Sequence, residues 1–109
     1  MTKVRFEIEW TEPAKTDLKE IVQFIQYRNP QRARELAKKW MAQIEMLHAH
    51  PERGRFVPET MAIGVDIYRE LILAPYRAVY RIRTNRVYIM GFFDGRRDLE
   101  EILFERLAR

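Results

Sequence analysis

The sequence predicts an α+β domain in which a helical hairpin packs on a curved antiparallel sheet, with the element order β-α-α-β-β-β-α. Three observations predict this fold. An alternating apolar pattern opens the chain, two tightly joined segments of helical period follow it, and three alternating segments at short spacing fill most of the second half. With 109 residues, the chain has the size of one domain and can bury a substantial core.

The first strand is expected over residues 4–10, VRFEIEW, because apolar and charged side chains alternate there. An alternation of this kind is typical of a strand that buries one face and exposes the other. The apolar positions are Val4, Phe6, Ile8 and Trp10.

Two helices follow the first strand. Thr11 is suited to cap the first helix, which is expected to end near Arg28. Asn29 and Pro30 have the residue types of an N-cap and a first helical position, and Pro51 stops the second helix. Because so few residues separate them, the two helices are expected to form an antiparallel hairpin.

The second half of the chain predicts a meander followed by a short helix. Residues 51–64 have turn-forming prolines and glycines without a clean period, and are interpreted as a loop that crosses the molecule. The segments 65–73, 76–83 and 86–93 alternate and are separated by short turns, which is typical of antiparallel strands. The last helix is expected to begin near Asp98.

Positive charge is concentrated in arginines of the second half. The chain has a net charge of +4 and a pI of about 9.6, and residues 53–97 hold nine arginines against four acids. All five lysines lie within the first 39 residues. Arginine is favoured where a planar guanidinium contacts phosphate or carboxylate in a bidentate manner. This distribution therefore suggests an anionic partner, although a solvated sheet face remains an alternative.

The stretch YRAVYRIR, residues 76–83, is where the choice between an anionic partner and a solvated face matters most. A period of two places Arg77, Arg81 and Arg83 on one side of the strand, together with Val79. Three uses are open for such a row: solvation, contact with nucleic-acid phosphate, or contact with carboxylates of another protein.

Several classes of function have little support. No apolar run approaches the roughly 18 residues needed to span a bilayer. The first ten residues lack the apolar region of a secretory signal and the chain has no cysteine, so a cytoplasmic location is expected. His48 and His50 stand alone and are interpreted as a polar helix end, so neither a metal nor another cofactor is predicted. The sequence contains no serine or cysteine to act as a nucleophile.

A metal-independent nuclease is the remaining enzymatic hypothesis. Glu59 is the candidate base, and Arg77 or Arg81 would hold the phosphate. A proton donor is missing, since no histidine follows His50. The strand tyrosines fall at positions that the alternation turns toward the core, namely Tyr76, Tyr80 and Tyr88. Losing one proton-transfer partner typically lowers a rate by about 10²- to 10⁴-fold, so the residues favour binding over cleavage.

Each candidate also has a structural interpretation. Glu59 is the residue type that would pair with an arginine of its own chain, namely Arg53, Arg55 or Arg69, and so fix the loop. Arg96 and Arg97 either anchor the turn into the last helix or contact a partner. Phe104 lies off the apolar stripe of that helix and is a candidate exposed contact.

Five motifs resemble the RelE/ParE superfamily, the toxins of bacterial type II toxin–antitoxin systems. They are WTEPAKTDL (10–18), PERGRFVPE (51–59), REL (69–71), YRAVYR (76–81) and DGRRD (94–98). The resemblance covers essentially the whole chain and implies one toxin domain over residues 1–109. The fold of that superfamily, a helical hairpin against a curved antiparallel sheet, agrees with the fold expected from periodicity.

The superfamily contains nucleases that cut mRNA in the ribosomal A site and ParE-like toxins that poison DNA gyrase. By motif position, Glu59 and Arg77 match a carboxylate and an arginine that some of the nucleases use. Where such a nuclease has a histidine near the end of the last strand, this sequence has Asp94 and Gly95. The resemblance therefore implies a ParE-like gyrase inhibitor, with a RelE-like ribosome-dependent mRNA endonuclease as the alternative.

The resemblance also implies a cognate antitoxin whose C-terminal segment wraps the toxin in a hetero-oligomer. Such a segment would supply carboxylates and apolar anchors. On this hypothesis the arginine row serves partner recognition first, phosphate binding second and solvation third. The residues expected to contact antitoxin or target are Arg69, Arg77, Arg81, Arg83, Arg96, Arg97 and Phe104.

Overall fold

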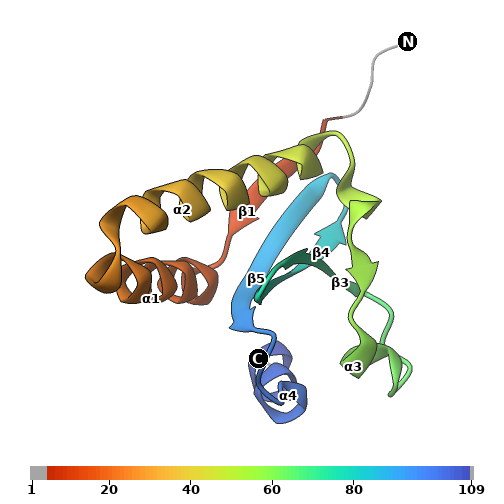
Figure 1. Cartoon of the computed structure of the whole chain (residues 1–109). Coiled ribbons are helices and arrows are strands. Elements are labelled where there is room, and N and C mark those ends of the chain that lie inside the picture. The colour runs from red at the N-terminus through yellow and green to blue at the C-terminus, as the bar shows by residue number, and fades with distance from the viewer. Residues whose placement is uncertain (1–4, 109) are drawn as a thin grey trace.

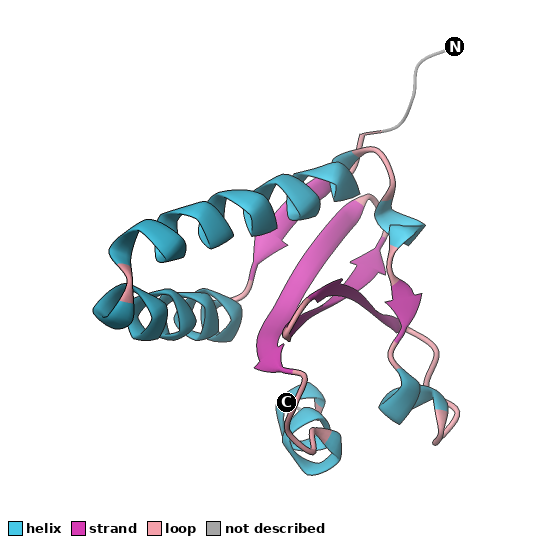
Figure 2. Cartoon of the chain, in the orientation of Figure 1, coloured by secondary structure: helices cyan, strands magenta, loops and turns pink. Residues whose placement is uncertain are grey.

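The structure, a computed structural model, describes residues 5–108 (Figures 1 and 2). The main elements in chain order are β1 (Glu7–Trp10), α1 (Glu12–Arg28), α2 (Pro30–Glu45), β2 (Arg55–Phe56), α3 (Pro58–Met61), β3 (Tyr68–Leu73), β4 (Tyr76–Arg83), β5 (Arg86–Asp94) and α4 (Glu100–Leu107). Two short 3-10 turns at Met46–His48 and Pro51–Arg53 lie between α2 and β2.

The five strands form one mixed sheet in the order β1-β5-β4-β3-β2. The α+β fold and the hairpin are confirmed, but the prediction of a wholly antiparallel sheet is wrong, because β1 runs parallel to β5. The other neighbouring strands are antiparallel. For β3–β4 and β4–β5, the short turns that join them require this direction. Side-chain alternation indicates which face of a strand is buried and carries no information on the direction of its neighbour.

The starts of α1 and α2 follow the predicted capping residues, whereas α2 ends at Glu45, earlier than the predicted stop at Pro51. The Thr11 hydroxyl accepts a hydrogen bond from the Ala14 amide at 3.3 Å and donates one to the Ile89 carbonyl at 2.8 Å. The Asn29 side chain accepts from the Arg32 amide at 3.1 Å and so separates α1 from α2. These bonds satisfy amide groups that the first turn of a helix leaves unpaired.

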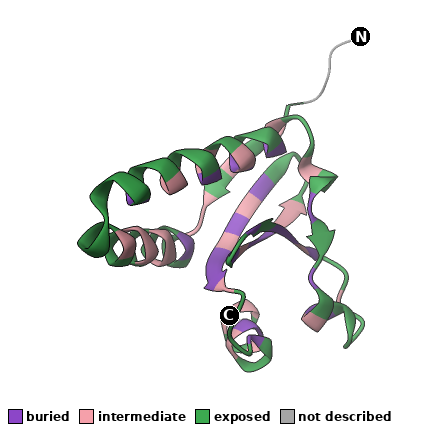
Figure 3. Ribbon diagram, viewed as in Figure 1, coloured by how far each residue is buried: buried purple, intermediate pink, exposed green. Residues whose placement is uncertain are grey.

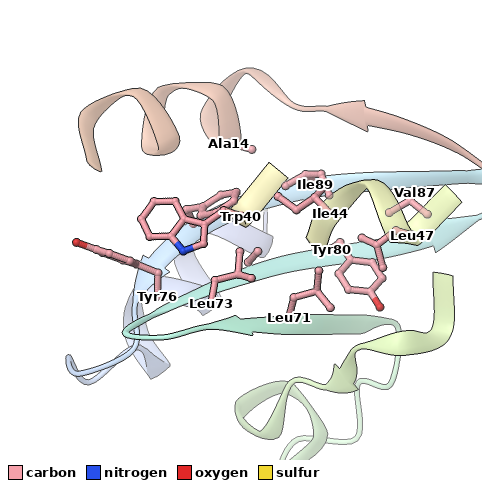
Figure 4. Packing of buried hydrophobic residues seen from close by; sticks show 12 residues of the cluster. Ala14, Trp40, Ile44, Leu47, Leu71, Leu73, Tyr76, Tyr80, Val87 and Ile89 are labelled. Carbon is pink, nitrogen blue, oxygen red and sulfur yellow. The ribbon is translucent and has the colours of Figure 1, made fainter. Parts of the chain in front are cut away.

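The main core lies between the helical hairpin and one face of the sheet (Figure 4). Trp40 of α2 packs edge-on against Tyr76 of β4, with ring centroids 5.3 Å apart. Trp10 of β1 stacks on Phe92 of β5 at 5.6 Å. Tyr76 and Tyr80, the β4 tyrosines predicted to face the core, do so, and Ala78 lies on the same face.

A second, smaller core covers part of the opposite face of the sheet. Val79 is fully buried there beside Phe93 of β5 and Leu103 of α4. The prediction that this face of β4 is an open row of guanidinium groups is therefore wrong over the first half of the strand. Figure 3 shows the resulting pattern, in which buried and half-buried residues alternate along β5 while the outer surfaces of the hairpin are exposed.

A register shift in β5 changes which of its side chains face the hairpin. Val79 pairs with Gly91 while Tyr80 pairs with Ile89, so Met90 is an extra residue in the ladder. Val87, Ile89 and Phe92 consequently share the hairpin side. Tyr88, predicted to face the core, instead lies opposite Arg81 on the other face of the sheet. The prediction fails because a period of two does not continue across a bulge.

The segment predicted as a loop, 51–64, has local structure of its own. It contains the two-residue strand β2 and the single-turn helix α3, which ends in a turn at Gly64 with a φ of 79°. The predicted strand over 65–73 begins only at Tyr68. Val4, predicted to open the first strand, lies outside the described residues.

Candidate functional site

The predicted arginine row divides into positions with different surroundings. The Arg77 side chain is only 11 % exposed, Arg81 is half-buried, and Arg83 is exposed. Among residues 5–108, Arg83 has no ion pair or hydrogen bond from its side chain, whereas Arg77 is held entirely by acids of its own chain. The three arginines therefore do not form one continuous anion-binding surface.

Arg77 is the centre of an ion-pair network of four residues. Its Nη1 and Nη2 donate to the two carboxylate oxygens of Glu59 at 2.8 and 2.6 Å, and its Nε donates to Glu70 at 2.6 Å. The other Glu70 oxygen accepts from Arg55 Nε at 2.7 Å. Glu70 has no exposed side-chain surface, so the two guanidinium groups compensate its buried charge. The network joins α3, β2, β3 and β4.

The network fixes the protonation states of Glu59 and Arg77. The hydrogen bond from Arg77 lowers the pKa of Glu59 below its ordinary value of 4.5, against a smaller opposing effect of burial. Hydrogen bonding to Glu59 and then to Glu70 raises the pKa of Arg77. Glu59 is consequently an ionised carboxylate at neutral pH, with both oxygens committed to a guanidinium.

This geometry bears directly on the nuclease hypothesis. A general base must accept a proton from a substrate hydroxyl within hydrogen-bond reach. Glu59 offers its oxygens to Arg77 instead, so the structure brings the predicted base and clamp together in a closed pair. Glu59 therefore pairs with Arg77 and with none of the three arginines expected for a loop-fixing role, Arg53, Arg55 and Arg69. The pair nevertheless fixes α3 to the sheet.

Proton donors lie apart from this pair. Tyr80 donates to the Pro51 carbonyl at 2.7 Å and accepts from the Gly54 amide at 2.8 Å, on the hairpin side of the sheet. Burial raises the pKa of Tyr80. His48 contacts the Phe6 carbonyl and Glu45 near the end of α2. Neither side chain reaches Glu59 or Arg77 by any hydrogen bond in the structure.

Arg69 anchors the segment before β2. Its Nη1 donates to the Gly54 carbonyl at 2.8 Å and to the Glu52 carbonyl at 3.3 Å, and its guanidinium lies 4.1 Å from the centre of the Phe56 ring. Arg69 pairs with Tyr80 in the sheet and so shares the hairpin face, away from Arg77. A role for Arg69 in partner binding stays a prediction.

Arg81 and Tyr88 lie opposite each other on the part of the sheet that α4 leaves open. The Arg81 guanidinium is 5.9 Å from the Tyr68 ring centre, and its buried Nε has no hydrogen-bond partner in the described chain. The carboxylate on the next strand, Glu9, is within 3.4 Å of Arg86. Arg81 thus lies beside aromatic rings, retains an unpaired N–H donor, and has no carboxylate bonded to it in the described chain.

Arg96 and Arg97 lie at the turn between β5 and α4. Arg96 makes a bidentate pair with Asp94, both distances being 2.9 Å, and this contact lowers the pKa of Asp94 to about 2. Arg97 is exposed and makes no side-chain hydrogen bond or ion pair within residues 5–108, although its charge also helps to lower the pKa of Asp94. Both arginines line a cleft of about 440 Å³ between α1 and α4, whose apolar wall includes Phe24.

One contact between α4 and α1 was not predicted from the sequence. Arg106 of α4 reaches α1, where Nη1 and Nη2 contact the Asp17 carboxylate at 2.7 and 3.1 Å. Asp17 also accepts from the Phe92 amide at 3.1 Å. The available signal was Asp17 itself, a charged residue in the helical series of Ala14, Leu18 and Ile21. The pair fastens α4 to the hairpin.

Phe104 is half-buried and lines an apolar groove of about 380 Å³ between α4 and the α3–β3 segment. Within the described residues there is no group of three potential metal ligands. In the same part of the chain, no helix has the length and apolar character needed to cross a bilayer.

The sequence matches the family described as "ParE toxin of type II toxin-antitoxin system, parDE" over residues 8–99. The chain belongs to the ParE toxin family. This confirms the resemblance on its ParE side, and membership in a ParDE system implies a cognate ParD antitoxin as partner. No functionally curated protein sequence matches this ParE-family chain.

A solved structure described as "Chromosomal ParDE TA system from P. aeruginosa" is similar in fold. A chain of that structure superposes with a TM-score of 0.68 at 22 % identity, covering 83 % of this chain and 96 % of its own. This similarity supports the architecture alone.

Proposed function

We propose that this ParE-family toxin arrests growth by binding DNA gyrase and inhibiting it, without cutting nucleic acid. In the cytoplasm it is held inactive by its cognate ParD in a hetero-oligomer. The observation that carries the proposal is the closed contact of Glu59 with Arg77, which engages both candidate nuclease residues with each other.

The requirements of phosphodiester cleavage, which this site does not meet, support a binding function. Cleavage without a metal requires a base for the 2′-hydroxyl, a cation for the phosphate and an acid for the leaving oxygen. Glu59 has its oxygens engaged and its pKa lowered, and Arg77 is neutralised by two acids. Arg81 retains a free donor, but no base accompanies it.

The exposed arginines are suited to an acidic partner. In the described chain, Arg83 and Arg97 make no side-chain hydrogen bond or ion pair, and Arg96 is largely exposed. A hydrogen bond to a charged group contributes about 1.5–3 kcal/mol, so a few carboxylates from ParD, together with apolar anchors, would give tight association. These positions are the ones we assign to antitoxin or target.

The test compares two activities of the same purified toxin. Gyrase supercoiling is measured with and without added ParD, and cleavage of mRNA is measured on programmed ribosomes. We expect inhibition of supercoiling that ParD reverses, with no cleavage. Cleavage at unaffected supercoiling would select the RelE-like activity, and growth arrest with neither effect would show a different target.

A further inference from the structure

The groove between α4 and the α3–β3 segment is unusual in its apolar exposure. Ile63 is 61 % exposed and Ile67 is 44 % exposed, and both line the groove opposite Phe104 and Leu107. Met61, on the same segment, is also exposed. Scattered apolar side chains are ordinary on a surface, whereas several that line one groove indicate an interaction site.

The charge around this groove is opposite to that of the chain. The two segments that form it, 57–68 and 98–105, carry six acids and no lysine or arginine in twenty residues. The whole chain has 20 basic and 16 acidic residues. One of the six acids, Glu59, is neutralised by Arg77. The four acids of segment 98–105 border a depression next to Phe104. Arg106, the first base after them, turns away toward Asp17.

Phe104 connects the apolar and acidic parts of this surface. It lines the groove together with Ile63 and Ile67, and on its other side it contacts a shallow depression bordered by Glu100 and Glu101. Asp66 is exposed between two lining residues of the α3–β3 segment. A segment seated on Phe104 would therefore meet apolar side chains below and carboxylates beside it.

We propose that this groove docks a basic segment of the target protein, one that inserts aliphatic side chains and places lysines or arginines against the rim. The assignment to the target rests on the proposed function, since an antitoxin segment rich in carboxylates would be repelled here. Complementary charge chiefly sets partner choice and association rate. The apolar anchors supply most of the affinity.

The chemistry of the groove is tested without gyrase. The probes are two amphipathic helical peptides, one of leucine and lysine and the other of leucine and glutamate, titrated into the wild-type toxin. We expect the lysine peptide to shift the methyl NMR signals of Ile63 and Ile67. Its binding should weaken at least tenfold in Glu101→Lys and less than twofold in Glu35→Lys, a matched exposed glutamate on α2. Equal binding of the glutamate peptide at these methyls would overturn the proposal.

The assignment to the target is tested with gyrase and ParD. Ile63→Lys changes an exposed side chain and should raise the concentration for half-inhibition of supercoiling at least tenfold, while ParD binding stays within twofold. Loss of ParD binding with intact inhibition would assign the groove to the antitoxin and refute the inference. If the wild-type toxin leaves gyrase unaffected, the proposed function fails, and the peptide titration alone then decides whether the groove accepts a basic segment.

Discussion

Replacing Arg77 with alanine should destabilise the fold strongly, which follows from the ion-pair network. The change removes three hydrogen bonds of 2.6–2.8 Å and leaves Glu70, which has no exposed side-chain surface, with Arg55 as its remaining cation. The Arg55 side chain is 59 % exposed, so it compensates the buried charge incompletely. Removing one partner of a buried ion pair costs about 3–5 kcal/mol, and we expect Arg77→Ala to lower the free energy of unfolding by that amount.

Urea denaturation, followed by the fluorescence of Trp10 and Trp40, measures this change. For small domains the denaturant slope is about 1–3 kcal/mol per molar urea, so the midpoint should fall by about 1 M or more. Arg83→Ala is the matched control on the same strand, because that side chain is exposed, and its effect should stay within about 0.5 kcal/mol. A loss below about 1 kcal/mol for Arg77→Ala would refute the reasoning that Glu70 depends on Arg77.

Three further changes test other contacts. Glu59 has a lowered pKa, so its contribution to stability is complete above pH 4.5 and is lost as the pH falls through the pKa of the folded state. On acid titration, the wild type should therefore lose more stability than Glu59→Gln loses. Equal losses would contradict this. Gly54→Ala would bring a Cβ within 2.5 Å of the Glu70 carbonyl and 2.6 Å of the Tyr80 hydroxyl, so calorimetry should show a loss of about 1–3 kcal/mol, and an unchanged melting temperature would rule out the close contact. Arg106→Met should speed amide exchange in α4 more than in α1 or α2, whereas uniform acceleration would indicate global destabilisation instead.

Local sequence signals were sufficient for the elements themselves. Thr11 and Asn29 mark helix starts by accepting a hydrogen bond from the amide three residues later, and Pro30 takes the first helical position; all three act as predicted. The strand over 76–83 was predicted to the residue. The bulge at Met90 was not predictable in this way, because it depends on how β5 meets β4 rather than on the residues of β5 alone.

The side-chain pairing was much less accessible from sequence. Glu59, Glu70 and Arg77 belong to three separate segments, and only the folded chain places them within hydrogen-bond distance. Residue type correctly indicated that Glu59 would find an arginine, but the choice among nine arginines between residues 53 and 97 depends on the sheet register and on α3. Charge counts therefore predicted an anionic partner without showing which cations were already neutralised.

The same two residues illustrate why a matching motif is weaker than its geometry as a guide to catalysis. A guanidinium has five N–H donors, and Arg77 uses its Nε and one from each Nη on acids of its own chain. Two donors remain, but two carboxylates already compensate the charge of Arg77, so a phosphate bound there would lie next to the Glu59 carboxylate. Repulsion between these anions opposes such binding, whereas exposed arginines such as Arg83 and Arg97 can accept an anion without this repulsion. Binding of an anionic partner through Arg83 and Arg97 therefore requires no rearrangement of the ion-pair network, whereas catalysis at Glu59 and Arg77 does.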